Sequence, residues 1–352
     1  MRSSRFAVLV VFVCAVLFTT NCSFYSRIMA RKNLVDGSIA YKDRKFEEAE
    51  GLFRKAAARD PEGATLEGRT AQLFLARTLH SRYIGSRENK GLAQQAVDEY
   101  KKAVPQVTHE YADAKAAYEA NKTGSAEQKR YYSALSSVNS TVSAIPSLLD
   151  NLGDKENAIQ FQKEVAANTQ LPETARARAL VSMGLEYNTC ANDITDTEKT
   201  KKTITKDGKQ AFQFVKPEKP EDLEMLKKCV VEGTQLTDQA VALETPDVKS
   251  ATSLNIKSLT DEQLKVKQDA LKVFESARSY KASLLIQDMR LAEMENRIPD
   301  RDRLKTESEA ARANFVQLSD VVKKIQAEMD ERTAAKEAET SANKANKAAE
   351  KK

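Results

Sequence analysis

The sequence predicts an all-α protein whose paired helices form a helix-turn-helix repeat solenoid, with a short β-hairpin-like insertion near residues 200–215. Glycine and proline are few, at 11 and 8 of 352 residues, tryptophan is absent, and 30% of the residues are charged. That composition favours a helical fold with much surface per residue. Apolar residues also recur at intervals of three or four, which is the spacing of one helix face.

The charge distribution argues against nucleic-acid binding. The formal net charge is +5, and removing residues 1–21, whose only charges are Arg2 and Arg5, leaves 54 basic against 51 acidic residues, or +3. Basic and acidic residues are interspersed, whereas a nucleic-acid site needs a clustered basic face. We therefore expect no nucleic acid among the partners.

Residues 1–21 have the layout of a secretory signal peptide. Two arginines precede an apolar run from Phe6 to Phe18, and small polar residues follow it. The run is short for a membrane-spanning helix, which needs about 20 residues.

The end of this segment, "LFTTNC", resembles a bacterial lipoprotein cleavage box, in which the cysteine becomes the lipidated first residue. Asn21 stands where such boxes usually carry Gly, Ala or Ser. Three outcomes stay open: a lipid on Cys22, an uncleaved N-terminal anchor, or cleavage and release. All three place the body outside the cytoplasm, and the lipid anchor implies a periplasmic or outer-membrane lipoprotein with residues 22–29 as a linker.

The remaining cysteines are candidates for a disulfide. Cys14 lies in the signal and Cys22 is the lipidation candidate, which leaves Cys190 and Cys229. An oxidising compartment favours a bridge between them. The alternative is two separate thiols in the core, a common location for cysteine.

The first helix pair is predicted around the stretch "KFEEAEGLFRKAAARDP", residues 45–61. A first helix precedes a turn at Asp43–Lys45, and the second ends at Pro61. The second helix alternates large and small residues on one face, which indicates close approach of a neighbouring helix. The packing positions are Gly37, Ala40, Phe46, Ala49, Phe53, Ala56 and Pro61.

These seven positions resemble the signature of the tetratricopeptide repeat, a helix pair of about 34 residues. Asn33 and Asp36 stand where that repeat usually carries tryptophan and leucine. A second copy repeats the spacing at Ala96, Tyr100 and Ala103, with a longer loop between its helices, and residues 151–172 form a weaker third copy. Gly184 and Tyr187 also fall on the repeat's offsets. The resemblance covers about two-thirds of residues 30–330, with repeats over residues 30–189 and further repeat-like helices over residues 221–330. It implies an all-α protein that mediates protein–protein contact.

Residues 190–220 interrupt the helical pattern. Asp207-Gly208 between β-prone runs predicts a hairpin, with Ile204 facing Phe212 or Phe214. Helices resume over residues 221–330, where a final helix caps the stack with one apolar stripe. That stripe consists of Phe315, Leu318, Val322, Ile325 and Met329. Residues 331–352 carry no large apolar side chain and are expected to be a solvated tail.

The sequence offers no catalytic constellation. The histidines, His80 and His109, have no cysteine neighbours for a metal site, and no glycine-rich phosphate loop is present. We therefore predict a protein that is not an enzyme and needs no cofactor.

A binding function is the better expectation. A solenoid presents first-helix side chains on its concave face, and the polar candidates there are Asn33, Arg77, His80 and Asn188; each is otherwise ordinary surface. Tyrosines 131, 132 and 187 are either partner anchors or core residues. The leading hypothesis is a membrane-anchored scaffold or adaptor that binds another envelope protein or peptide. The alternative is a periplasmic carrier of peptides or glycans, which would need a deep pocket.

Overall fold

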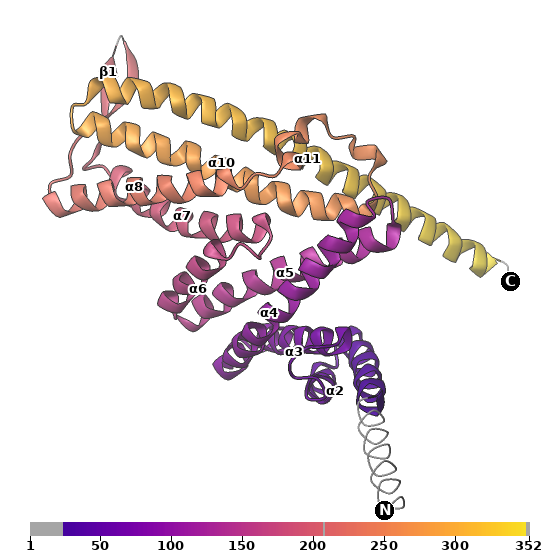
Figure 1. The fold of residues 1–352 in the computed structure, drawn as a ribbon. Coiled ribbons are helices and arrows are strands. Elements are labelled where there is room, and N and C mark those ends of the chain that lie inside the picture. Colours follow the sequence, from indigo (N-terminus) through magenta and orange to yellow (C-terminus); the bar gives the residue numbers. More distant parts are fainter. Residues whose placement is uncertain (1–23, 207, 350–352) are drawn as a thin grey trace, which may run out of the picture. The chain divides into compact units, whose positions relative to one another are not determined.

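The computed structural model describes residues 24–206 and 208–349 and confirms the all-α class. Successive helices pack against their neighbours in chain order, and among these residues the β-structure is one antiparallel hairpin (Figure 1). The predicted signal peptide, residues 1–21, and the candidate lipidation site Cys22 lie outside the described residues. The chain divides into two compact units, residues 1–161 and 162–352.

The described part of unit 1 consists of stacked helices. Residues 24–42 are helical and are followed by α2 (Phe46–Ala57), α3 (Leu66–Gly85), α4 (Lys90–Ala120) and α5 (Ser125–Leu152). Helix α6 (Lys155–Ala167) contains the boundary between the units.

Close helix packing explains the small residues of the first pair. A Cβ added to Gly37 would lie 2.8 Å from the ring of Phe53, which is completely buried. Ala49 and Ala56, on the same face of α2 as Phe53, are also completely buried. Pro61 lies in the exposed turn that follows α2. The glycine therefore lets the helix at residues 24–42 approach the large ring.

The beginning of unit 1 differs from the prediction. Residues 24–29 were expected in a linker but are helical. No glycine or proline interrupts this stretch, Ala30 is buried one turn later, and Arg27 forms an ion pair with Glu67 of α3 at 3.4 Å. These contacts hold the first turns in the helix.

Helices α4 and α5 are longer than the second helix of a repeat. They contain 31 and 28 residues, and each continues through an internal proline, Pro105 or Pro146. Helix α5 ends at Gly153, whose φ of 84° is left-handed. Residues 111–150 therefore extend one long helical hairpin, a length that the repeat pattern does not predict.

Unit 2 begins with α7 (Glu173–Thr195) and the hairpin of β1 (Lys201–Lys206) and β2 (Lys209–Phe214). It continues with α8 (Pro220–Ala242), α9 (Pro246–Lys249), η1 (Ala251–Ser253), η2 (Ile256–Ser258), α10 (Asp261–Met294) and α11 (Ile298–Ala349). Helices α10 and α11 run side by side in Figure 1. The predicted repeat region 30–189 crosses the unit boundary, because α7 packs against α8 and α10.

Small residues also join α7 to α8. A Cβ on Gly184 would lie 3.1 Å from Thr237, and one on Gly233 would lie 3.0 Å from Tyr187. The predicted stripe of α11 covers the core of this unit, with Leu318, Val322 and Ile325 buried. Its two end residues, Phe315 and Met329, are half-buried.

The insertion is shorter than predicted. Helix α7 continues past Cys190 to Thr195 and α8 begins at Pro220, so the excursion covers residues 196–219. The pairing predicted for Ile204 is wrong: Ile204 pairs with Ala211, while Phe212 pairs with Thr203 and Phe214 with Lys201. A hairpin joined by two residues fixes this register, with Lys206 opposite Lys209.

The C-terminal segment differs from the prediction at its beginning. Helix α11 includes residues 331–349, and Arg332 contacts Asp261 at 3.0 Å and the carbonyl of Leu259 at 2.7 Å. Lys336 also pairs with Asp261. Cations four positions apart reach one carboxylate at the start of α10, which holds this part of the helix against the unit.

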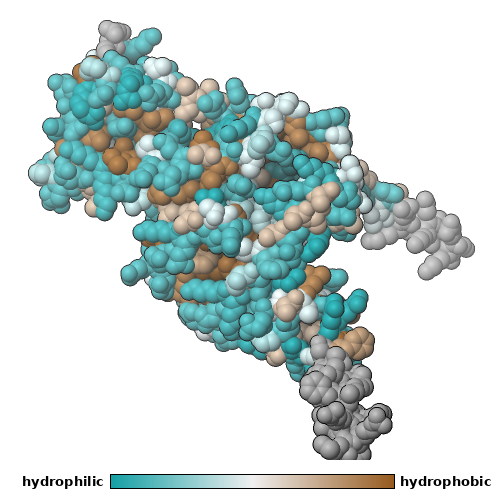
Figure 2. Space-filling view, in the orientation of Figure 1, coloured by the Kyte–Doolittle hydropathy of each residue, from teal (hydrophilic) through white to brown (hydrophobic). Residues whose placement is uncertain are grey.

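The surface is mostly hydrophilic, with smaller hydrophobic areas (Figure 2). In the part of the chain that the structure describes, no helix combines the length and the apolar character that crossing a membrane requires.

Candidate partner-binding surface

Helix α3 carries Arg77 and His80 one turn apart, both half-buried. The Arg77 guanidinium donates a hydrogen bond of 3.0 Å to the hydroxyl of Ser140 on α5 and lies 5.6 Å from the ring centroid of Phe74. Among the described residues, no carboxylate lies within 4 Å of it. The structure thus holds a cation in place without neutralising it.

The Phe74 ring, against which the Arg77 guanidinium packs, is itself held by other aromatic rings. The Phe74 ring lies 5.4 Å from the buried ring of Phe53 and 6.0 Å, edge-on, from the ring of Tyr41. The Tyr41 hydroxyl shares a hydrogen bond of 3.0 Å with the Ser81 hydroxyl, which joins the helix at residues 24–42 to α3. Because Phe74 packs against Phe53 and Tyr41, the ring that contacts the Arg77 guanidinium is fixed in position.

His80 packs against Tyr100 of α4. The rings meet edge-on at 5.9 Å, and the imidazole Nδ1 lies 3.3 Å from the phenol oxygen. Burial, together with the positive charge of Arg87, holds the pKa of His80 below its ordinary value of 6.5. Burial raises the pKa of Tyr100 to about 12. At neutral pH both partners of this contact are therefore uncharged.

This contact predicts a loss of stability on mild acidification. A lowered folded-state pKa means that the unfolded chain binds a proton at His80 more readily, so stability falls as the pH drops below about 6.5. We expect His80→Gln to lose less stability than the wild type between pH 7.5 and 5.5 in urea denaturation. His109→Gln is the control: it removes an exposed imidazole that lies 3.2 Å from Asp113 and leaves His80 in place, so the loss of stability caused by His80 should remain. Equal pH dependence of the wild type and His80→Gln would contradict the prediction.

The other predicted groove residues do not join this surface. Asn33 is half-buried on the helix at residues 24–42, and no hydrogen bond joins it to Arg77 in the described chain. Asn188 belongs to unit 2 and is buried, and its Oδ1 has no hydrogen-bond partner among the described atoms. Asn188 is thus a polar core residue, because the face of α7 that carries it packs against other helices.

Tyr131 and Tyr132 belong to a cluster of tyrosines between α4 and α5. The rings of Tyr118 and Tyr131 stack at 5.0 Å, Tyr111 lies 6.0 Å from Tyr131, and Tyr132 lies 6.4 Å from Tyr118. Both predicted tyrosines are half-buried, as is Tyr187 in unit 2. The cluster joins the long helical hairpin and still exposes part of its aromatic surface.

Sequence reasoning missed Tyr41, Phe74, Ser81 and Ser140. Tyr41 and Phe74 are separated by about one repeat length. A comparison of equivalent positions in successive repeats could therefore have identified this aromatic pair. The contact between Arg77 and Ser140 joins residues 63 positions apart and leaves no such signal. Only the packing of α3 and α5 against the same helix, α4, brings these two side chains together.

Two open pockets in the described chain are lined by paired charges. One of about 720 Å³ lies in unit 1, where Arg82 pairs with Glu47 at 3.0 Å and also contacts Glu50. Another of about 340 Å³ lies in unit 2, where Arg278 pairs with Glu244 at 2.6 Å. The described residues contain no cluster of His, Cys, Asp and Glu that could hold a metal ion. Neither pocket combines aromatic walls with free polar groups.

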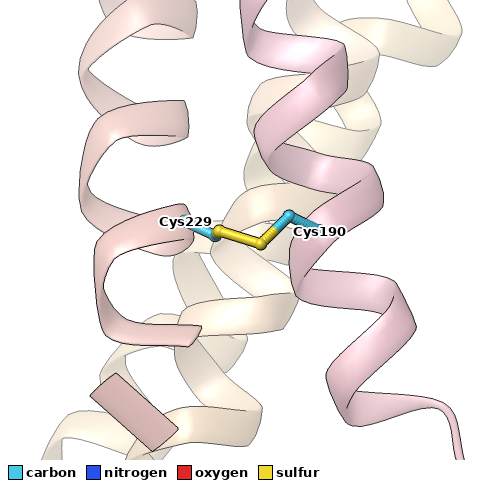
Figure 3. Close-up of a disulfide and its surroundings, with 2 residues drawn as sticks. All are labelled: Cys190 and Cys229. Carbon is cyan, nitrogen blue, oxygen red and sulfur yellow. A yellow bond between two sulfur atoms is a disulfide. The ribbon is translucent and has the colours of Figure 1, made fainter. Parts of the chain in front are cut away.

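In unit 2 a disulfide joins Cys190 of α7 to Cys229 of α8, with Cα atoms 6.2 Å apart (Figure 3). The hairpin that follows α7 is fixed at its base. There the Phe214 ring packs 4.6 Å from the Arg290 guanidinium, and the Phe214 N–H donates to Glu293 at 3.3 Å. Phe212 is 59% exposed, with the Lys201 ammonium over its ring. The hairpin thus presents a small apolar and cationic surface.

No protein-family model matches the sequence, and no curated protein matches it.

Proposed function

We propose that this chain is a membrane-anchored, extracytoplasmic scaffold or adaptor of the tetratricopeptide-repeat type that binds another protein of the bacterial cell envelope. The surface around Arg77 holds that partner. The N-terminal segment, with its apolar run and Cys22, attaches the protein to the membrane.

One observation carries the binding part of the proposal. Arg77 is half-buried and oriented by Phe74 and Ser140, but no carboxylate of the described chain neutralises it. A charge-assisted hydrogen bond to such a preorganised guanidinium is stronger than one between neutral groups. The surface therefore suits a carboxylate of the partner, either an acidic side chain or a C-terminus.

The neighbouring groups fit an extended polypeptide better than a small buried ligand. His80 and Ser81 lie on α3 beside Arg77, and Tyr41 and Phe74 add aromatic area. Hydroxyl and imidazole groups can bond main-chain amides, while rings pack against side chains. The two pockets described above, at Arg82 and at Arg278, are open and do not form the enclosed aromatic site that would favour a carrier of small molecules.

Cross-linking in intact cells tests this proposal. The full chain with a C-terminal tag is purified after cross-linking, and mass spectrometry identifies the proteins recovered with it and the linked positions. We expect one envelope protein near stoichiometry, linked close to α3 and α5. No enriched protein, despite efficient cross-linking of control proteins, would contradict the adaptor function.

Substitution of Arg77 sharpens the test. Arg77→Ala should weaken the partner's affinity by roughly 30-fold, since truncating a central interface arginine costs about 2 kcal/mol. Arg77→Lys should restore part of it, because lysine keeps the charge but lacks the guanidinium's fork of donors. Arg312→Ala, an exposed arginine of α11, is the matched control. Equal recovery with Arg77→Ala and Arg312→Ala, with links at the hairpin, would move the binding site to residues 196–219.

A further inference from the structure

The helix at residues 24–42 has a second apolar face that no described residue covers. Phe24, Ile28, Val35 and Ile39 are 67%, 48%, 51% and 55% exposed. They follow one another at four, seven and four positions, so they form a stripe along one face of the helix. We call these four residues the N-terminal stripe. The buried face, which includes Gly37 and Ala40, packs inward and lies on another side of the helix.

Cations border this stripe. The helix contains four basic residues and one acidic residue, Asp36. Arg27 is paired with Glu67, but Arg31, Lys32 and Lys42 are exposed and form no ion pair within the described chain. Each of these three lies three or four positions from a stripe residue. An apolar stripe with cations beside it is the pattern of a helix that lies in a membrane interface.

We propose that the N-terminal stripe inserts into the surface of an anionic bilayer, so that the helix at residues 24–42 lies along the membrane. This inference rests on the proposed membrane attachment. Phe24 follows the candidate lipid site Cys22 by two residues, and two residues span at most about 7 Å. The apolar run Phe6–Phe18 likewise ends shortly before the helix. Either anchor therefore delivers the beginning of the stripe to the bilayer surface.

Charge favours lipid over a second copy of the chain as the occupant. Two copies packed stripe to stripe would bring Arg31, Lys32 and Lys42 against the same cations of the other copy. Anionic headgroups instead attract such residues within a Debye length of the surface. Hydrophobic side chains are visible at the surface where the described chain begins (Figure 2).

The absence of tryptophan from the chain makes a direct test possible. Ile28→Trp places a single fluorophore on the stripe, and Ile84→Trp places one at a matched exposed isoleucine on α3, off the stripe. Each full-length variant is reconstituted into phosphatidylcholine–phosphatidylglycerol vesicles whose acyl chains are brominated or plain. Flotation of the same samples reports whether the chain is attached to the vesicles.

We expect bromine to quench Ile28→Trp about twofold or more while Ile84→Trp is unchanged, since an interfacial helix inserts to the acyl boundary. Replacing phosphatidylglycerol with neutral lipid should reduce this quenching, and equal quenching would overturn the role of the cations. Flotation without quenching overturns the inference and leaves membrane attachment standing. Failure to float overturns the attachment itself. A blue-shifted Ile28→Trp emission that bromine does not quench, with cross-links between copies, overturns lipid in favour of a dimer.

Discussion

Replacing Cys190 and Cys229 together with serine is expected to lower the free energy of unfolding of unit 2 by about 4 kcal/mol in the chain-entropy account of a closed loop. The two cysteines are separated by 39 positions, and the loop between them contains the hairpin. The bridge joins α7 to α8 at a site where Cys229 is 2% exposed. Without the bridge, the unfolded chain gains conformational entropy, because the loop between Cys190 and Cys229 is no longer closed.

Hydrogen exchange of the α7 and α8 amides is the suitable measurement, because a chain of two units need not unfold in one step. Exchange in α7 and α8 should accelerate in the double variant, and reductant should bring the wild type to the same rates. Reductant should leave the double variant unchanged. Equal protection of the wild type and the double variant in the absence of reductant would contradict a stabilising bridge.

Phe53→Ala is expected to destabilise unit 1 by about 4 kcal/mol, as large-to-small changes at buried aromatic residues do. The Phe53 ring is completely buried, fills the space left by Gly37 and supports the Phe74 ring. Because Phe74 lies under the Arg77 guanidinium, partner recovery should fall as well.

Urea denaturation followed by circular dichroism measures the first effect, and the cross-linking experiment measures the second. Phe212→Ala is the matched control, since Phe212 is 59% exposed on the hairpin and its removal should change stability by less than about 0.5 kcal/mol. A loss for Phe53→Ala no larger than that of the control would contradict the packing of the first helix pair.

Features of the fold that depend on local sequence patterns could be predicted, whereas others could not. The helix pair around Gly37 and Phe53 could be predicted because packing repeats every three or four residues. The hairpin was predicted from Asp207-Gly208, but its register was predicted wrongly, although a two-residue connection there already places Ile204 opposite Ala211. Helices α4 and α5 exceed the length of a repeat's second helix, and each continues through an internal proline, Pro105 or Pro146.

The candidate surface was predictable only in part. Arg77 and His80 were both named from the sequence because they lie on one face of a predicted first helix. Asn188 was named by the same reasoning and is buried, since the pattern marks a polar position without showing which helix will cover it.

By itself, the sequence determined the all-α class, the helix pairing and the small residues where helices cross. These depend on local periodicity and on residue size, which any single stretch of chain displays. Only the tertiary structure decided that Arg77 has no carboxylate within reach, that Asn188 is enclosed and that α7 packs with α8 and α10. Those facts depend on contacts between residues far apart in the chain, and such contacts produce no periodic pattern in the sequence.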